Sequence, residues 1–204
     1  ISIVERTGYK GLDEIKVEGG KFTAKGDNAA VKAYNWENQT ASSFTQAEKV
    51  SVSGGTFSSA VDKSLCADGF IPTDNGDGTY GVKEGKFVAE IGSQGYESLQ
   101  AAIDAAKSGA TVKLLADTRE NVTIAKKLTL DLNGFTLNGG TVKGTPALKV
   151  DNCSVTVKDS SAEQTGTIKR EDTADNSGVS SHYVIDIQGK NGFLKFEGGN
   201  VVNN

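Results

Sequence analysis

The stretch from Phe87 to Gly144, FVAEIGSQGYESLQAAIDAAKSGATVKLLADTRENVTIAKKLTLDLNGFTLNGGTVKG, changes its hydrophobic period halfway along. In its first half apolar residues recur at i, i+3, i+4 and i+7, which predicts one amphipathic helix. These residues are Leu99, Ala102, Ile103 and Ala106. Ser98 is placed to cap the start of the helix and Gly109 its end. From Thr111 onward, short alternating runs separated by Gly, Asn and Asp predict strands joined by tight turns.

The composition indicates a globular protein rich in β structure. The 204 residues include 25 glycines and two prolines, and 36% are hydrophobic, which favours strands and tight turns over a helical protein. The net charge is −4, and basic residues are interspersed with acidic ones along the chain. Because no basic block is present to neutralise phosphates, we expect no nucleic acid partner.

The sequence has the features expected of an internal fragment of an exported protein. It contains no methionine and no run of 18 apolar residues, so we expect no membrane insertion within it and an export signal or anchor outside it. Cys66 and Cys153 fall in different predicted units, so each is interpreted as a small packed residue and no disulfide is implied.

A Gly-Gly phrase recurs along the chain. IKVEGGKFTA at 15–24 and VSVSGGTFSS at 50–59 each combine an alternating strand, a Gly-Gly corner and another short strand. The phrase returns as LKFEGGNVV at 194–202 and in weaker form as LNGGTV at 137–142. Because the spacing between the glycine pairs varies, the pattern predicts stacked coils of variable length and no fixed-length repeat.

A second similarity suggests a register for these coils. LTLDLN, beginning at Leu128, can be laid over LKVDNC, beginning at Leu148, a shift of 20 positions that places Asp131 on Asp151. VIDIQG continues this column with Asp186. On such strands the Leu and Val neighbours must face inward, so the three carboxylates are predicted to face outward, about 4.8 Å apart.

The remaining segments set the predicted organisation. Residues 160–181 are polar and predict a loop, and FIPTDNGDGTYGV, within 58–85, predicts a β-hairpin that turns at Asn-Gly and Asp-Gly. We therefore expect two domains. Residues 1–85 would hold the last coils of one solenoid with its closing segment and hairpin, and residues 86–204 the cap helix and first coils of a second.

These motifs resemble parts of known proteins. The helix YESLQAAIDAA, the strand TVKLL and the coil LTLDLNG together look like the N-terminal cap and first coils of right-handed parallel β-helix proteins of the pectin-lyase-like class. The phrases GGTFSS, LCADGF and NGDGTYGV are similar to the closing segment of β-helix modules in large repetitive surface proteins of gut bacteria. This order of parts, with an end before a beginning, suggests a parent protein made of tandem modules.

The column Asp131, Asp151 and Asp186 is the candidate metal site. Like charges at strand spacing raise each other's pKa or invite a cation, and the resemblance implies calcium-assisted lyase chemistry on such outward acids. The alternative is that these positions are simply polar. Lyases of that class also need an Arg or Lys base, and no matching motif supplies one. A glycoside hydrolase would need one buried and one solvated acid, of which the sequence gives no sign.

AYNWENQ at 33–39 is the candidate carbohydrate-binding segment. Tyr34 and Trp36 stand at i and i+2, on one face of an extended strand, where aromatic rings can stack on sugars. The alternative is that both rings pack under the following loop. DNGDGT beginning at Asp74 is interpreted as a hairpin turn because Gly85 stands where an EF-hand places its last glutamate. His182, the only histidine, is interpreted as a loop residue.

The sequence thus predicts a mainly β fold of right-handed parallel β-helix coils with a short capping helix and a linking hairpin. The predicted function is a non-enzymatic structural or adhesive module of an elongated bacterial surface protein, located outside the cell. The alternative is a carbohydrate-binding module or a calcium-assisted lyase or hydrolase. The expected partners are host or plant glycans or other copies of the same protein. No cofactor is predicted, unless the carboxylates bind calcium.

Overall fold

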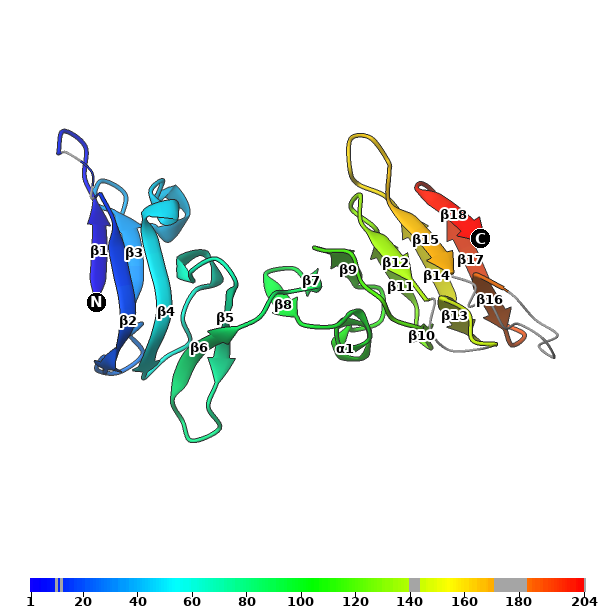
Figure 1. The fold of residues 1–204 in the computed structure, drawn as a ribbon, viewed down its shortest axis with the longest axis horizontal. Helices are drawn as coiled ribbons and strands as arrows, with labels where there is room; N and C mark the ends of the chain where they lie inside the picture. The colour runs from blue at the N-terminus through cyan, green and yellow to red at the C-terminus, as the bar shows by residue number, and fades with distance from the viewer. Residues whose placement is uncertain (10, 12, 140–143, 171–182, 204) are drawn as a thin grey trace. The chain divides into compact units, whose positions relative to one another are not determined.

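The computed structural model describes residues 1–9, 11, 13–139, 144–170 and 183–203 (Figure 1). The chain is mainly β, as predicted, and it contains parallel sheets. It divides into two compact units, Ile1–Lys86 and Phe87–Asn204, each with its own hydrophobic core. In the part of the chain that the structure describes, no helix has the length and apolar character needed to cross a lipid bilayer.

In unit 1 the chain forms two strands and then places a second strand beside each of them. Its first four strands are β1 (Ser2–Glu5), β2 (Ile15–Phe22), β3 (Lys32–Asn35) and β4 (Val50–Phe57). β1 pairs with β3 and β2 pairs with β4, both in parallel. The described part of the unit also contains the 3₁₀ turns η1 (Ala41–Ser43), η2 (Ala47–Lys49) and η3 (Lys63–Leu65). The four strands bury side chains in a shared core, among them those of Ile3, Val17, Ala33, Val50 and Val52.

The two Gly-Gly phrases of unit 1 lie side by side on β2 and β4. Ile15 is opposite Val50 and Phe22 is opposite Phe57, with an irregular register between these two pairs. A Cβ atom on Gly54 would lie 2.2 Å from the carbonyl oxygen of Glu18, so the corner of β4 fits over that of β2 only with glycine at this position. The repeated phrase is therefore a repeated backbone corner.

The end of unit 1 contains the predicted hairpin. β5 (Phe70–Asp74) and β6 (Tyr80–Glu84) are antiparallel, and β6 joins the sheet beside β4. Gly76 and Gly78 adopt φ values of 78° and 81°, which a side chain would disfavour, so the glycines predicted at the turn are required there. Val61 and Leu65, each 3% exposed, turn inward in the segment before the hairpin.

Unit 2 begins with a short hairpin and the predicted helix. β7 (Ala89–Ile91) and β8 (Gln94–Tyr96) pair antiparallel, and α1 (Leu99–Ala105) follows. Ser98 caps α1, because its hydroxyl accepts a hydrogen bond from the Ala101 amide at 3.1 Å. The predicted end at Gly109 is wrong: the helix stops at Ala105, and Gly109, at φ 85°, makes the turn towards the next strand.

The rest of unit 2 passes repeatedly through three sheets in the same order. The strands are β9 (Thr111–Leu114), β10 (Val122–Ile124), β11 (Leu128–Asp131), β12 (Thr136–Asn138), β13 (Leu148–Asp151), β14 (Ser154–Lys158), β15 (Thr167–Arg170), β16 (Ile185–Gln188), β17 (Phe193–Phe196) and β18 (Asn200–Asn203). β9, β11, β14 and β17 are parallel neighbours, as are β12, β15 and β18, and β10, β13 and β16. Each pass thus adds one strand beside its predecessor in each sheet it reaches.

The core of unit 2 collects inward side chains from all three sheets and from α1. Its largest fully buried members are Leu99, Ile103, Leu114, Ile124, Leu130, Leu132, Leu137, Leu148 and Ile168. Burying each such side chain contributes about 1.5–3 kcal/mol, so the stacked passes stabilise one another mainly through this core.

The register predicted from the 20-position shift is wrong. Leu128 lies opposite Val155, and Leu148 lies opposite Ile185, because β11 and β13 belong to different sheets. The pass from Leu128 to Val155 returns to the same sheet after 27 positions. The similarity between the two segments arises because every strand carries inward apolar residues at alternate positions, whichever sheet it joins.

The predicted loop at 160–181 contains a strand. Residues 167–170 form β15, in which Ile168 is fully buried and Arg170 is 3% exposed. The part of that segment beyond Arg170 lies outside the described residues. So do His182 and the residues Thr141 and Val142 that were predicted to form a strand.

Candidate functional site

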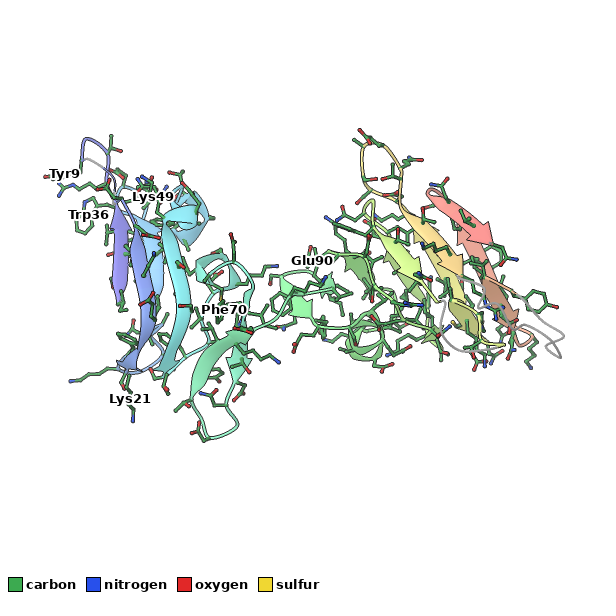
Figure 2. The ribbon with its side chains drawn as sticks, viewed as in Figure 1. Tyr9, Lys21, Trp36, Lys49, Phe70 and Glu90 are labelled. Carbon is green, nitrogen blue, oxygen red and sulfur yellow. The ribbon has the colours of Figure 1, made fainter. Side chains whose placement is uncertain are left out.

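The candidate site in unit 1 lies where β1 and β3 end. Arg6 directly follows β1 and Trp36 directly follows β3. Because these strands are parallel neighbours, their carboxyl ends meet at one edge, and the Trp36 amide donates a hydrogen bond to the Glu5 carbonyl oxygen at 2.8 Å. After Arg6 the chain turns, so that the Tyr9 ring also lies beside the Arg6 guanidinium. Figure 2 shows Tyr9 and Trp36 at the same end of unit 1.

Arg6 lies against both aromatic rings. Its guanidinium carbon is 5.0 Å from the centre of the Tyr9 ring and 5.5 Å from that of Trp36, within range of cation–π attraction. Tyr9 is 69% exposed and Trp36 48% exposed, so much of each ring is open to solvent. We call this site the aromatic cleft. Its volume is about 390 Å³ and its lining residues are Val4, Glu5, Arg6, Tyr9, Gly11, Trp36 and Gln46.

Two carboxylates hold the loops around the aromatic cleft. Glu5 accepts hydrogen bonds from the amide and the hydroxyl of Thr45, and these bonds hold the pKa of its carboxyl below the usual value. Glu37 accepts a hydrogen bond from the Thr7 amide at 2.8 Å, which lowers the pKa of Glu37 in the same way. Both groups thus stay ionised and fix the loops that carry the rings.

The partner predicted for Trp36 is not the one that the structure places in the aromatic cleft. Tyr34 lies within β3, half-buried, with the Lys32 amine 4.6 Å from the centre of its ring. Trp36 stands in the turn after β3, so strand alternation no longer relates it to Tyr34. Sequence reasoning missed Arg6 and Tyr9, because their approach to Trp36 depends on the pairing of β1 with β3.

The three predicted metal ligands do not form a column. Asp131 is in β11, whereas Asp151 and Asp186 are in β13 and β16, which belong to another sheet. Within that sheet Asp186 lies opposite Lys149, and Asp151 lies opposite Gln188.

Each of these acids has a nearby partner of its own. Asp131 is 3% exposed; it lies 3.3 Å from the Lys158 amine and accepts a hydrogen bond from the Ser160 amide at 2.9 Å. Asp151 lies 3.4 Å from the Lys149 amine, and Asp186 accepts a hydrogen bond from the Gln188 amide group at 2.7 Å. Among the described residues no three His, Cys, Asp or Glu side chains gather as a metal site, and calcium binding by these acids stays an untested prediction.

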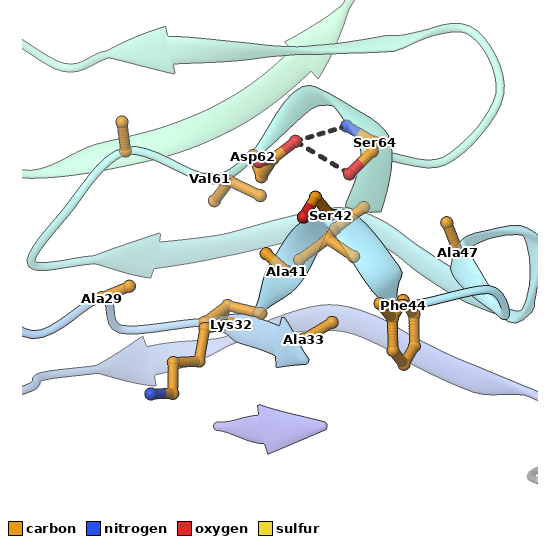
Figure 3. Close-up of a pocket in the computed structure, with 13 residues that line it drawn as sticks. Ala29, Lys32, Ala33, Ala41, Ser42, Phe44, Ala47, Val61, Asp62 and Ser64 are labelled. Carbon is orange, nitrogen blue, oxygen red and sulfur yellow. Dashed lines mark hydrogen bonds between the residues drawn. The ribbon is translucent and has the colours of Figure 1, made fainter. Parts of the chain in front are cut away.

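A larger cleft in unit 1, of about 650 Å³, lies between β3 and the turns η1 and η3 (Figure 3). Small apolar side chains such as Ala33, Ala41 and Val61 make up much of its wall. Its one carboxylate, Asp62, accepts hydrogen bonds from the amide and hydroxyl of Ser64, at 2.9 and 2.8 Å, and so caps η3. The carboxylate therefore has a structural role in this cleft.

Unit 2 has a shallower cleft of about 240 Å³ on the outer side of β12. Its lining residues are Asp117, Thr118, Arg119, Thr136, Asn138 and Lys169. The Asp117 carboxylate accepts a hydrogen bond from the Thr136 amide at 2.7 Å, which fixes the start of β12 against the preceding pass. Of the three clefts, only the aromatic cleft combines exposed aromatic rings with a cation. Compared with protein-family models, with curated proteins and with solved structures, the chain gives no match.

Proposed function

We propose that the chain is a non-enzymatic structural or adhesive module of an elongated, tandem-repeat bacterial surface protein, built from coils of right-handed parallel β-helix. The observation that supports this most directly is the order of passes in unit 2. In one sheet the strands β9, β11, β14 and β17 lie side by side in parallel, in the order in which they occur in the chain. In the other two sheets the strands are also arranged in chain order.

Such a stack suits a stalk for physical reasons. Each pass buries the inward side chains of its neighbour and pairs its backbone groups, so the element grows in one dimension. At the start of unit 2, α1 places Leu99, Ala102 and Ile103 on the core with exposures of 0–1%, which supports the role of a cap over the first pass. The β5–β6 hairpin closes the last pass of unit 1 in a comparable way, with β6 beside β4.

Cell-surface labelling tests this function. Antibodies raised against residues 1–204 should label intact cells of the source bacterium, and brief protease treatment of those cells should remove the label. Antibodies against a cytoplasmic protein of the same cells serve as the control and should label only after lysis. If the antibodies against this chain also label only lysed cells, a surface module is excluded.

Carbohydrate binding at the aromatic cleft is the second candidate, and the exposed Trp36 and Tyr9 rings beside Arg6 favour it. Rings of this kind stack on sugars, and a guanidinium recognises a carboxylate, so acidic sugars are the expected class. On a glycan array, Trp36→Ala should abolish binding to uronic acid oligosaccharides. Tyr183→Ala, which removes a 58% exposed ring in the other unit, should not. Equal binding by the two variants would remove the candidate.

The enzymatic alternative is tested separately. Polygalacturonate and host glycans incubated with the chain, with and without calcium, should release no unsaturated or reducing sugar above the blank. Release that depends on calcium and disappears in Asp151→Asn would instead support the lyase interpretation.

A further inference from the structure

The last pass of unit 2 exposes the side chains that would continue its core. β16, β17 and β18 each lie at the end of their sheet. Ile187, Phe196 and Val201 are 47%, 39% and 48% exposed. One pass earlier, their strand partners Val150, Val157 and Ile168 are all 0% exposed. The three exposed residues thus belong to inward columns, and a further pass beside these strands would cover them. We call these three strands the carboxyl edge.

The first pass of unit 1 contains a glycine, Gly19, at which an added Cβ would meet no other atom. Gly19 in β2 and Gly54 in β4 are the first glycines of the two stacked Gly-Gly phrases. A Cβ on Gly54 would lie 2.2 Å from the Glu18 carbonyl oxygen of the preceding pass, whereas a Cβ on Gly19 would meet no atom within 4 Å. Nothing around Gly19 in this chain requires glycine, but a preceding pass with the same corner would.

The carboxyl edge carries that corner. Between β17 and β18 the chain reads Glu197-Gly198-Gly199, as β2 reads Glu18-Gly19-Gly20. The second glycine has a positive φ in every complete phrase: 105° at Gly20, 116° at Gly55 and 90° at Gly199. The three corners therefore share two glycines and a positive φ at the second of them, and two of these corners already stack on each other in unit 1.

We propose that the carboxyl edge of one copy of this chain binds β1 and β2 of a second copy by parallel strand addition. In this contact β17 lies beside β2, with Leu194 opposite Ile15 and Phe196 opposite Val17, and the Glu197 carbonyl lies over Gly19. The contact joins two different surfaces of the module, so each copy can bind a further copy head to tail. The stack then lengthens, whether the copies are separate chains or neighbouring modules of one chain. The contact names the partner for the proposed structural function and rests on that function.

The charges of two lysines determine where cysteines are placed in the test. The proposed register sets Lys195 directly opposite Lys16, and like charges so placed destabilise a strand pair. Each lysine is paired at present with a glutamate of its own strand region, Lys195 with Glu197 at 2.5 Å and Lys16 with Glu14 at 3.2 Å. Replacing both lysines by cysteine removes the repulsion and puts two thiols at neighbouring strand positions, where a disulfide can form.

The experiment uses the full chain with Cys66→Ser and Cys153→Ser, so that the introduced thiols are the only ones. A chain with Lys195→Cys is mixed with a chain with Lys16→Cys under mild oxidation, and the mixed disulfide is followed by mass spectrometry. The matched control replaces Lys16→Cys by Glu84→Cys, an exposed hairpin position away from β1 and β2. The proposal expects the first pair to react about tenfold faster than the control pair. Equal rates overturn it.

A single methyl group tests the corner. Adding Gly19→Ala to the Lys16→Cys chain should reduce its rate to that of the control pair while the thermal unfolding of that chain stays unchanged, because the site is open within one copy. An unchanged crosslinking rate overturns the proposal.

An intrachain pair separates this contact from the stack itself. Thr156 and Lys195 lie opposite each other on β14 and β17, so Thr156→Cys with Lys195→Cys should close a disulfide within one chain. If this bond forms and the mixed pair does not react, the contact between copies is wrong and the stacked module stands. If neither forms, the proposed module fails with it.

Discussion

Phe22 stacks on Phe57 with ring centres 5.2 Å apart and ring planes inclined by 13°. The two rings end equivalent Gly-Gly phrases on neighbouring strands, so the repeat in the sequence becomes a ladder of side chains in the fold. Phe57 is 1% exposed, whereas Phe22, in the first pass, is only half-buried. The same side chain should therefore contribute differently at the two positions.

Truncating the two rings measures that difference. Phe57→Ala should lower the free energy of unfolding of unit 1 by about 3–5 kcal/mol, the usual cost of a large core truncation. Phe22→Ala should cost about 1–2 kcal/mol, because part of its surface is already in water. Trp36 is the only tryptophan and belongs to unit 1, so its fluorescence in a urea titration reports on this unit alone. Equal costs at the two positions would contradict the ladder.

A carboxylate from the loop after β9 holds the start of α1. Glu120 accepts hydrogen bonds from the amides of Leu99 at 2.8 Å and Gln100 at 3.1 Å, two groups with no partner inside the helix. Glu120→Ala should destabilise α1 by about 1–2 kcal/mol and speed amide exchange in the peptide that contains it. Glu163→Ala, at an exposed carboxylate of the same unit, is the control. Unchanged exchange in Glu120→Ala would show that Ser98 alone caps the helix.

A buried carboxylate joins three backbone amides in unit 2. Asp159 is 7% exposed and accepts hydrogen bonds from Gly134 at 2.9 Å, Ser161 at 2.9 Å and Gly166 at 2.6 Å. Burial by itself raises the pKa of Asp159, but the hydrogen bonds, led by the one from the Ser161 amide, outweigh it and hold the pKa below its usual 3.8. The ionised side chain therefore stabilises the folded state.

Asp159→Asn should reveal this stabilisation as a pH-dependent loss. At pH 7 the variant should lose about 1–3 kcal/mol, because an amide accepts these bonds less strongly and one of its atoms is a donor. The contribution of a carboxyl with a lowered pKa is present above the unfolded value of 3.8 and disappears as the pH falls through the folded value. Urea titrations at several pH values should show the two proteins converging in acid. Glu163→Gln, at an exposed carboxylate of the same unit, is the matched control.

Sequence reasoning succeeded where the cause of structure is local. The periodicity around Leu99, the Ser98 cap and the glycines of the hairpin act over a few residues, and the structure has each of them. Sequence reasoning failed where the structure depends on which strands lie next to each other. Alternation shows that Leu128 and Leu148 point inward, but it carries no information about which sheet each strand joins. The Asp131 column depended on that choice.

The aromatic cleft shows the same limit. Trp36 could be singled out from its residue type, but Arg6 and Tyr9 reach it only through the parallel pairing of β1 with β3. The repeated Gly-Gly phrase acts over a longer range. The structure pairs the two strands of unit 1 that carry it, and Gly54 leaves room there for the Glu18 carbonyl oxygen.

The last prediction concerns the thiol of Cys66 in unit 1. Burial, aided by the negative charge of Asp62, raises its pKa from 9.0 to about 11. The thiolate is the reactive form, so at pH 8 Cys66 should react with iodoacetamide about 100-fold more slowly than a thiol of pKa 9.0. A raised thiol pKa also means that the associated stability is present below pH 9.0 and is lost as the pH rises towards about 11. Peptide mass spectrometry should show labelling of Cys66 that rises about tenfold per pH unit up to that value. In urea, which unfolds the chain, labelling should already be fast at pH 9. Fast labelling of the folded protein at pH 8 would contradict the raised pKa of this half-buried thiol.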